Sequence, residues 1–254
     1  MLWQAIFFDT RWRFLFGLVL LTVTAAFVVM GYPTVAELVK AAPQLGNGGQ
    51  LGREIAAAAA ASSTYDGYIQ SQWFRQNAAQ LGSFFAAILG AGGLLSQGAA
   101  ARMFTLSLPV SRERLFGLRA AAGLTQVLIL AVVPALAVTL LSPLVHERFA
   151  LLDTLAYALC VFAGTAAFFS LAFLMSTMLS NMWAPVLITI CAGSALQMID
   201  RLAGGQVRFS LLGMMHGDSY FRGDGLPWPM LLATAALTTA LLYGAVRNIA
   251  HRDF

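Results

Sequence analysis

Long runs without a charged residue constrain this chain most. The 46 residues from Thr154 to Ile199 contain no Asp, Glu, Lys, Arg or His. As one helix they would measure about 69 Å, more than twice the roughly 30 Å hydrocarbon core of a bilayer. The run therefore has to fold back on itself. The stretch from Ser180 to Pro185 is the predicted hinge, with Pro185 starting the next helix.

The overall composition leads to the same class of protein. Of 254 residues, 59% are hydrophobic and 10% are charged, and the mean hydropathy is +0.76. Soluble domains average about 45–50% apolar and about 25% charged residues, so a water-soluble globule, a disordered chain and a collagen-like fibre are excluded. The net charge of +4 comes without an Arg/Lys-rich run, so nucleic acid is not an expected partner. We predict an all-α polytopic membrane protein with a single domain embedded in a lipid bilayer.

Six stretches are predicted to span the membrane, and Pro33 is expected to end the first of them. Ahead of that span, tryptophans and arginines such as Trp12 and Arg13 recur at helical spacing. They indicate an amphipathic helix in the membrane interface, with an extension of the first span as the alternative. Polar residues 33–77 are expected to connect the first two spans, and residues 200–225 suit a re-entrant segment. The six predicted spans are residues 14–32, 78–95, 120–145, 154–179, 185–199 and 226–246.

Small residues recur four apart in the second predicted span. They form two stripes, which are Gly82, Ala86 and Gly90, and Ser83, Ala87 and Ala91. Such stripes let helix backbones approach closely in lipid, although an alanine-rich chain also produces them by chance.

The distribution of positive charge predicts the orientation. With six spans, one side holds both termini, the loop at 97–119 and the hinge at 180–184. That side carries eight basic and three acidic residues, against seven and eight on the other. Positive charge near span ends marks the cytoplasmic side. We therefore expect a multi-pass protein of the bacterial inner membrane with both termini in the cytoplasm.

Two rare residue types limit the chemistry. Lys40 is the only lysine and lies between Val39 and Ala41, so the chain has no Gly-Lys-Ser/Thr phosphate-binding loop. Any ATP-driven work therefore belongs to a partner. The two cysteines, Cys160 and Cys191, lie in apolar runs, which argues against a disulfide.

The cytoplasmic loop before the third span carries the most specific motif. It reads Phe104-Thr105-Leu106-Ser107-Leu108-Pro109-Val110-Ser111-Arg112-Glu113-Arg114-Leu115. Its apolar side chains, the helix-breaking proline and a capping serine describe a rigid elbow beside the membrane. The simpler alternative is that the arginines only anchor the end of a span.

This loop resembles that of the permease subunits of ABC type-2 exporters, and the six-span layout is similar over the whole chain. The resemblance implies ABC ATPase subunits and a second permease copy or a sister permease as partners. ATP and Mg would lie on the ATPase, with no cofactor on this chain. Family members carry a Glu and a Gly-Thr pair just before the motif, and residues 96–101 here lack them. The resemblance implies an ATPase-coupling role for Phe104, Leu106, Leu108, Pro109, Val110, Ser111, Arg112 and Arg114.

Polar residues within spans are the candidates for a substrate pathway, although most such groups only bond neighbouring helices. Gln126 and Gln197 lead, because an amide needs several partners, and Thr125 and Thr165 follow. No span contains an Asp, Glu, Lys, Arg or His, so an amphiphilic cargo such as a drug, peptide or lipid is expected rather than an inorganic ion.

Two alternative readings come from other classes of protein. An intramembrane enzyme would need ionisable groups at membrane depth, and none is found in the predicted spans. His216, Asp218 and Asp224 match no zinc spacing and are read as a solvated loop. A non-transporting scaffold of an assembly complex, such as cytochrome biogenesis, would share the permease architecture and remains open.

Overall fold

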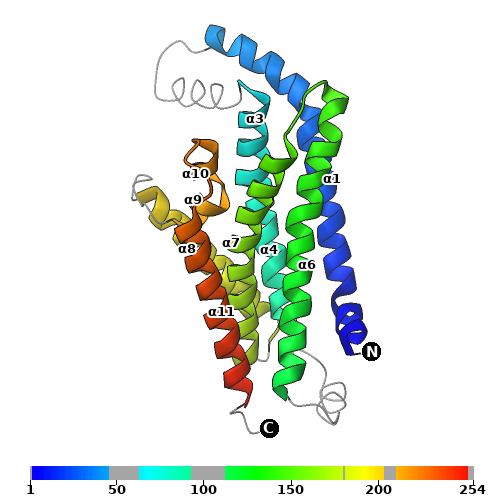
Figure 1. Ribbon diagram of the computed structural model, residues 1–254, viewed down its shortest axis with the longest axis vertical. Coiled ribbons are helices and arrows are strands. Elements are labelled where there is room, and N and C mark those ends of the chain that lie inside the picture. Colours follow the sequence, from blue (N-terminus) through cyan, green and yellow to red (C-terminus); the bar gives the residue numbers. More distant parts are fainter. Residues whose placement is uncertain (1, 46–62, 93–111, 180, 203–209, 251–254) are drawn as a thin grey trace.

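The computed structural model describes residues 2–45, 63–92, 112–179, 181–202 and 210–250, and the regular elements of these residues are all helices. They form an elongated bundle in which α1, α6, α7 and α11 run roughly along one axis (Figure 1). The helices are α1 Leu2–Leu45, α3 Tyr65–Tyr68, η1 Ile69–Ala78, α4 Ala79–Ala91, α6 Arg112–Leu141, η3 Ser142–Val145, α7 Leu151–Met178, α8 Trp183–Leu202, α9 Leu211–Met215, α10 Asp218–Phe221 and α11 Trp228–Ala250.

Among the described residues, five helices are long and apolar enough to cross a membrane. These stretches are Thr10–Val39, Arg114–Val145, Leu151–Met178, Trp183–Leu202 and Trp228–Ile249. They cover five of the six predicted spans and agree with an all-α multi-pass membrane protein. The remaining span, 78–95, falls on α4, whose 13 residues are too few to cross alone. A sixth crossing stays a prediction.

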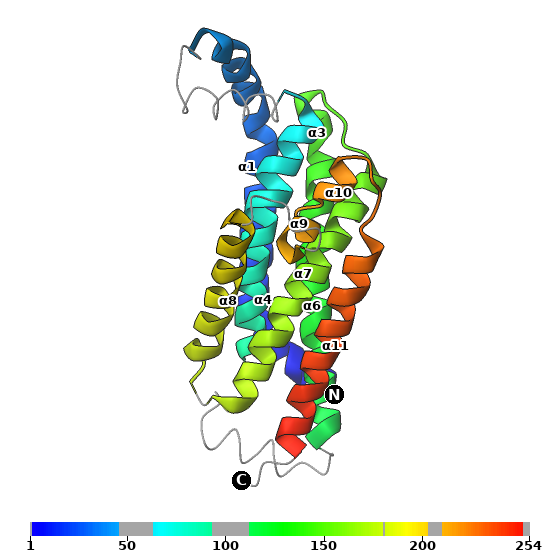
Figure 2. The ribbon, with the colours of Figure 1, turned by 90° about the vertical axis from the view of Figure 1, so that its left-hand side faces the viewer.

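The expected break after the first span is wrong. Helix α1 continues without interruption from Leu2 to Leu45, so Pro33 lies inside it. A proline in a helix removes one backbone hydrogen bond and bends the axis, but the flanking turns persist. The upper end of α1 turns away from the bundle in Figure 1, and its N-terminal end turns aside in Figure 2. The N-terminal residues are therefore continuous with the helix of the first span, and their place in the membrane interface stays a prediction.

The polar connection predicted for residues 33–77 is also helical over its last part. Helices α3, η1 and α4 follow one another directly from Tyr65 to Ala91. The Thr64 hydroxyl accepts a hydrogen bond from the Gly67 N–H at 3.2 Å and caps the start. In the π-helical η1, the Asn77 side-chain amide donates to the Gln72 carbonyl at 2.6 Å. Polar side chains thus stabilise this helix through local hydrogen bonds that hydropathy does not register.

The predicted hinge is confirmed. Helix α7 ends at Met178, and α8 begins at Trp183 with Pro185 in its first turn. The backbone N–H of Trp183 donates to the Asn181 side-chain oxygen at 3.0 Å, which caps α8. The long uncharged run therefore makes two helices.

Both small-residue stripes of α4 pack against neighbours. An added Cβ at Gly82 would lie 3.0 Å from the Thr165 side chain on α7, and one at Gly90 only 2.4 Å from the Phe169 carbonyl oxygen. Ala87 and Ala91, from the second stripe, form a small buried cluster with Val186 of α8. Close packing of the helices is thereby confirmed over a chance pattern.

We expect Gly90→Ala to lower the free energy of unfolding by about 1–3 kcal/mol, because its methyl group would collide with the backbone of α7. The matched control is Gly117→Ala in α6, where an added Cβ meets nothing within 4 Å. That change should be neutral or stabilise the helix by up to about 1 kcal/mol. Thermal unfolding in detergent measures both, and equal shifts for the two variants would contradict the packing.

Candidate functional site

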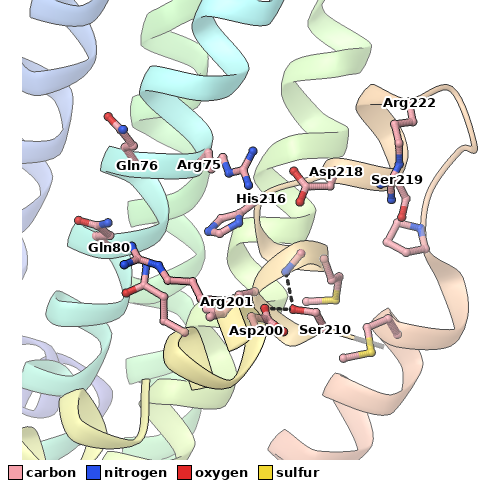
Figure 3. Close-up of a pocket in the computed structure, with 16 residues that line it drawn as sticks. Arg75, Gln76, Gln80, Asp200, Arg201, Ser210, His216, Asp218, Ser219 and Arg222 are labelled. Atoms are coloured by element: carbon pink, nitrogen blue, oxygen red, sulfur yellow. Dashed lines mark hydrogen bonds between the residues drawn. The ribbon is translucent and has the colours of Figure 1, made fainter. Parts of the chain in front are cut away.

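A polar hollow lies between η1, the end of α8 and the α9–α10 segment (Figure 3). Its volume is about 480 Å³, within the range of small-molecule sites. Polar side chains from separate elements meet at this hollow. Those used below are Arg75, Gln76, Gln80, Gln197, Asp200, Arg201, Ser210, His216, Asp218 and Arg222.

An apolar cavity adjoins the polar hollow. Its volume is about 340 Å³, and its lining includes Phe84 of α4, Phe168 of α7 and Ile190 of α8. The two spaces are adjacent, because four residues line both of them. These residues are Gln80, Gln197, Leu212 and His216. The combined site is therefore polar at one end and apolar at the other.

Helix α9 forms one wall, and a glycine of α7 determines how deeply it inserts. The Ser210 hydroxyl accepts a hydrogen bond from the Gly213 N–H at 2.9 Å and starts the helix. Met215 is buried against Gly164, where an added Cβ would lie 2.7 Å from its sulfur. The segment predicted as re-entrant thus packs between the long helices, and its depth in a membrane remains a prediction.

Gly217 orients the two polar residues on either side of it. Its φ of +69° is the left-handed conformation that favours glycine, and an added Cβ would lie 2.5 Å from the Tyr157 ring. The turn at Gly217 separates His216, at the end of α9, from Asp218, at the start of α10. Both line the hollow because this turn is tight.

The carboxylates of the hollow already have donors. The Gln70 side-chain amide donates to Asp218 Oδ1 at 3.3 Å and to the His216 carbonyl at 3.2 Å. The Ser210 hydroxyl donates to Asp200 Oδ2. In the part of the chain that the structure describes, neither Arg75 nor Arg201 forms an ion pair with a carboxylate. The hollow therefore presents exposed guanidinium groups beside carboxylates that are hydrogen-bonded within the protein.

His216 lies between these two arginines in Figure 3. Burial lowers the pKa of His216 below its ordinary value, and the Arg75 charge lowers it further, while Asp218 and Asp200 act in the opposite direction. The imidazole is consequently neutral at pH 7 and can both donate and accept a hydrogen bond.

Of the four residues predicted for a substrate pathway, Gln197 alone lines the site. Gln126 is buried and donates from Nε2 to the Thr10 hydroxyl at 2.8 Å, which joins α6 to α1. Thr165 is buried and donates to the Val161 carbonyl at 2.8 Å. Thr125 is exposed and donates to the Ala121 carbonyl at 2.9 Å. The structure does not bring these four side chains together.

Most of the predicted ATPase-coupling loop lies outside the described residues, since Phe104, Leu106, Leu108, Pro109, Val110 and Ser111 fall there. Arg112 is the first residue of α6, and Arg114 is exposed in its first turn.

Near the start of α6, two arginines connect α1, α4, α6 and the α7–α8 hinge at one end of the bundle. Arg119 of α6 donates to the Gly92 carbonyl at the end of α4. Arg13 of α1 donates from Nη2 to the sulfur of Met182, in the α7–α8 hinge, at 3.3 Å. An added Cβ at Gly92 would lie 3.2 Å from Arg13 Nη1, so the two contacts are neighbours. We call these four residues the arginine junction.

A metal site is not supported by the candidates named from the sequence. Within the described ranges, no group of three or more His, Cys, Asp or Glu side chains is arranged to hold a metal ion. Asp218 accepts from Gln70, and Asp224 pairs with Arg222 at 3.7 Å. Both cysteines are free thiols, Cys160 buried and Cys191 exposed.

The sequence did not single out Arg75 or Arg201. Each lies at the border of a predicted span, where charges ordinarily anchor helix ends. One signal was available beside Arg75, because Gln76 and Gln80 are four residues apart and so mark a polar helix face next to it.

Comparisons with protein-family models, curated proteins and solved structures find no match for this chain. What the site binds therefore has to be argued from its own side chains.

We expect His216 to titrate below the ordinary histidine value of about 6.5, because burial disfavours its charged form. Nuclear magnetic resonance of ¹⁵N-histidine-labelled protein measures the midpoint, with His216→Gln assigning the signal. Asp218→Asn should lower the midpoint further and Arg75→Gln should raise it. A wild-type midpoint at or above the ordinary value would show that the imidazole is solvated.

Proposed function

We propose that this chain is the membrane-spanning permease subunit of an ATP-driven ABC exporter. It moves an amphiphilic substrate outward across the bacterial inner membrane, and a separate ATPase subunit supplies the energy. The observation that carries the proposal is the polar hollow together with the apolar cavity beside it, which we call the hollow from here on. It lies between α4, α8 and α9, and it is polar at one end and apolar at the other. Such a site, placed among apolar helices, suits a molecule with both kinds of surface.

The loop at residues 104–115 supports an ATPase partner. Its sequence resembles that of ABC type-2 permeases, and the chain has no phosphate-binding loop of its own. Helix α6, which follows the loop, begins at the end of the bundle where α1 begins and α11 ends (Figure 1). With both termini in the cytoplasm, that end faces a soluble ATPase.

The arginine junction connects the loop to the helices that line the hollow, so a movement of the ATPase against the loop reaches them. A push on the loop reaches α6 first, and Arg119 transmits it to the end of α4. Arg13 extends the connection to α1 and to the hinge between α7 and α8. Because α4 and α8 both line the hollow, a rigid-body shift of these helices changes its shape.

The direct test is a mild-detergent pull-down of the tagged protein from its native membranes. We expect the wild type to capture an ATPase with a phosphate-binding loop, and Arg112→Glu with Arg114→Glu to lose it through charge reversal at the loop. Arg148→Glu is the control, since this exposed arginine lies in the connection between η3 and α7, away from the loop. It should capture the ATPase as the wild type does.

Two other outcomes of the pull-down would count against the proposal. If neither wild type nor variant captures an ATPase, the proposed exporter has no subunit that supplies energy, and a non-transporting scaffold becomes the better account. If the loop variant captures the ATPase as well as the wild type, coupling does not depend on these arginines.

A further inference from the structure

The hollow consists of the polar part lined by Arg75 and Arg201, called the recess below, and of the apolar cavity. Four residues line both parts. One of these is the amide side chain of Gln197, and another is His216. A ligand that fills the combined space therefore meets hydrogen-bonding groups at one end and aromatic and aliphatic side chains at the other.

Two arginines of the recess can contact the headgroup of a ligand. Asp200 and Asp218 accept hydrogen bonds from Ser210 and Gln70, which satisfies part of their capacity within the protein. Arg222 pairs with Asp224 at 3.7 Å. Arg75 and Arg201 are the lining cations that remain available to a ligand among the described residues, and both are exposed. Asp200 and Asp218 keep their negative charges, so an anion is recognised here by direct contact with the two guanidinium groups and not by an overall positive charge.

The arginines come from different elements and face one recess. Arg75 belongs to η1 and Arg201 to the last turn of α8, and in Figure 3 they lie on either side of His216. A guanidinium group recognises phosphate or carboxylate oxygens with paired N–H donors. The amides of Gln76 and Gln80 add neutral donors on the α4 side.

The apolar cavity supplies the second half of the recognition. Phe84, Phe168, Ile190 and Met215 line it, and it leads away from the recess between α4 and α8. Two small residues, Ser83 of α4 and Gly193 of α8, are also part of its lining. An alkyl chain laid there removes apolar surface from water.

We propose that the hollow binds an amphiphile with a single alkyl chain and an anionic phosphate or carboxylate headgroup. The headgroup lies against Arg75 and Arg201, and the alkyl chain lies along Phe84 and Ile190. That this amphiphile is the cargo rests on the proposed exporter function, whereas the binding itself does not.

Native mass spectrometry of the purified chain, titrated with dodecyl phosphate, measures the binding. We expect Arg75→Gln with Arg201→Gln to weaken it by about tenfold or more, because both charge-assisted contacts are lost. Arg148→Gln removes one exposed charge elsewhere and should leave the affinity unchanged. Circular dichroism and thermal unfolding establish that the variants keep the fold. Equal affinity in the double variant and the wild type overturns the proposal.

The choice of probes separates the headgroup from the tail. Dodecyl maltoside and dodecyltrimethylammonium share the alkyl chain and should bind about tenfold more weakly or worse. Inorganic phosphate alone should bind weakly, and if it binds as tightly as dodecyl phosphate, the site is an anion site without a tail. Preference for the cationic probe would also overturn the assignment.

A substitution in the apolar cavity tests the position of the tail. Ser194 lines that cavity, so Ser194→Phe should weaken dodecyl phosphate binding while leaving butyl phosphate binding unchanged. Ala195→Phe introduces the same side chain at the next, exposed position of α8, which does not line either space. It should have no effect, and equal losses in both variants would place the tail elsewhere.

These measurements use the isolated chain and so separate the two proposals. If the protein binds selectively by headgroup but captures no ATPase, the proposed binding site is supported and the proposed exporter function is rejected. If the protein captures an ATPase but does not distinguish the headgroups, the exporter function is supported and the proposed binding site is rejected.

Discussion

The close approach of α4 to α7 is the contact on which the rest of the bundle depends. Within lipid, helices gain little from burying apolar surface, so association requires backbones that come near each other. Gly82 and Gly90 provide this by leaving room for Thr165 and for the Phe169 carbonyl. Helix α7 is the central element of the bundle. Of its most apolar stretch of residues, 67% are buried, and the helix contacts α4, α6, α8, α9 and α11.

The site follows from that central helix. Gly164, halfway along α7, admits Met215, and Gly217 turns the chain over the Tyr157 ring. These two glycines place His216 and Asp218 beside η1 and α8, and the polar hollow results. A π-helix lines this hollow on one side, and irregular helical turns of this kind are frequent at functional sites. Packing in the core and chemistry at the site are thus consequences of the same small residues.

Hydropathy predicts the long helices of this chain and the hinge near Pro185, because apolar runs and a helix-breaking residue are local properties. It misplaces helix ends where local and tertiary contacts decide them. Helix α1 continues through Pro33, and in η1 the Asn77 side chain bonds to the Gln72 carbonyl. The site was predictable in part. Gln197 follows from an amide in an apolar span, but Gln126 carries the same signal and bonds to Thr10 instead. Which amide faces a cavity depends on helix rotation, and the sequence does not determine that rotation.

We propose that binding of an anionic amphiphile in the hollow is coupled, through the helices between them, to ATP hydrolysis by a partner subunit at the loop. The most direct measurement is ATP hydrolysis by the captured complex in phosphatidylcholine nanodiscs, with dodecyl phosphate or dodecyl maltoside added. The account predicts that dodecyl phosphate alone stimulates hydrolysis and that Arg75→Gln with Arg201→Gln abolishes the stimulation. Hydrolysis that is indifferent to both amphiphiles would contradict it.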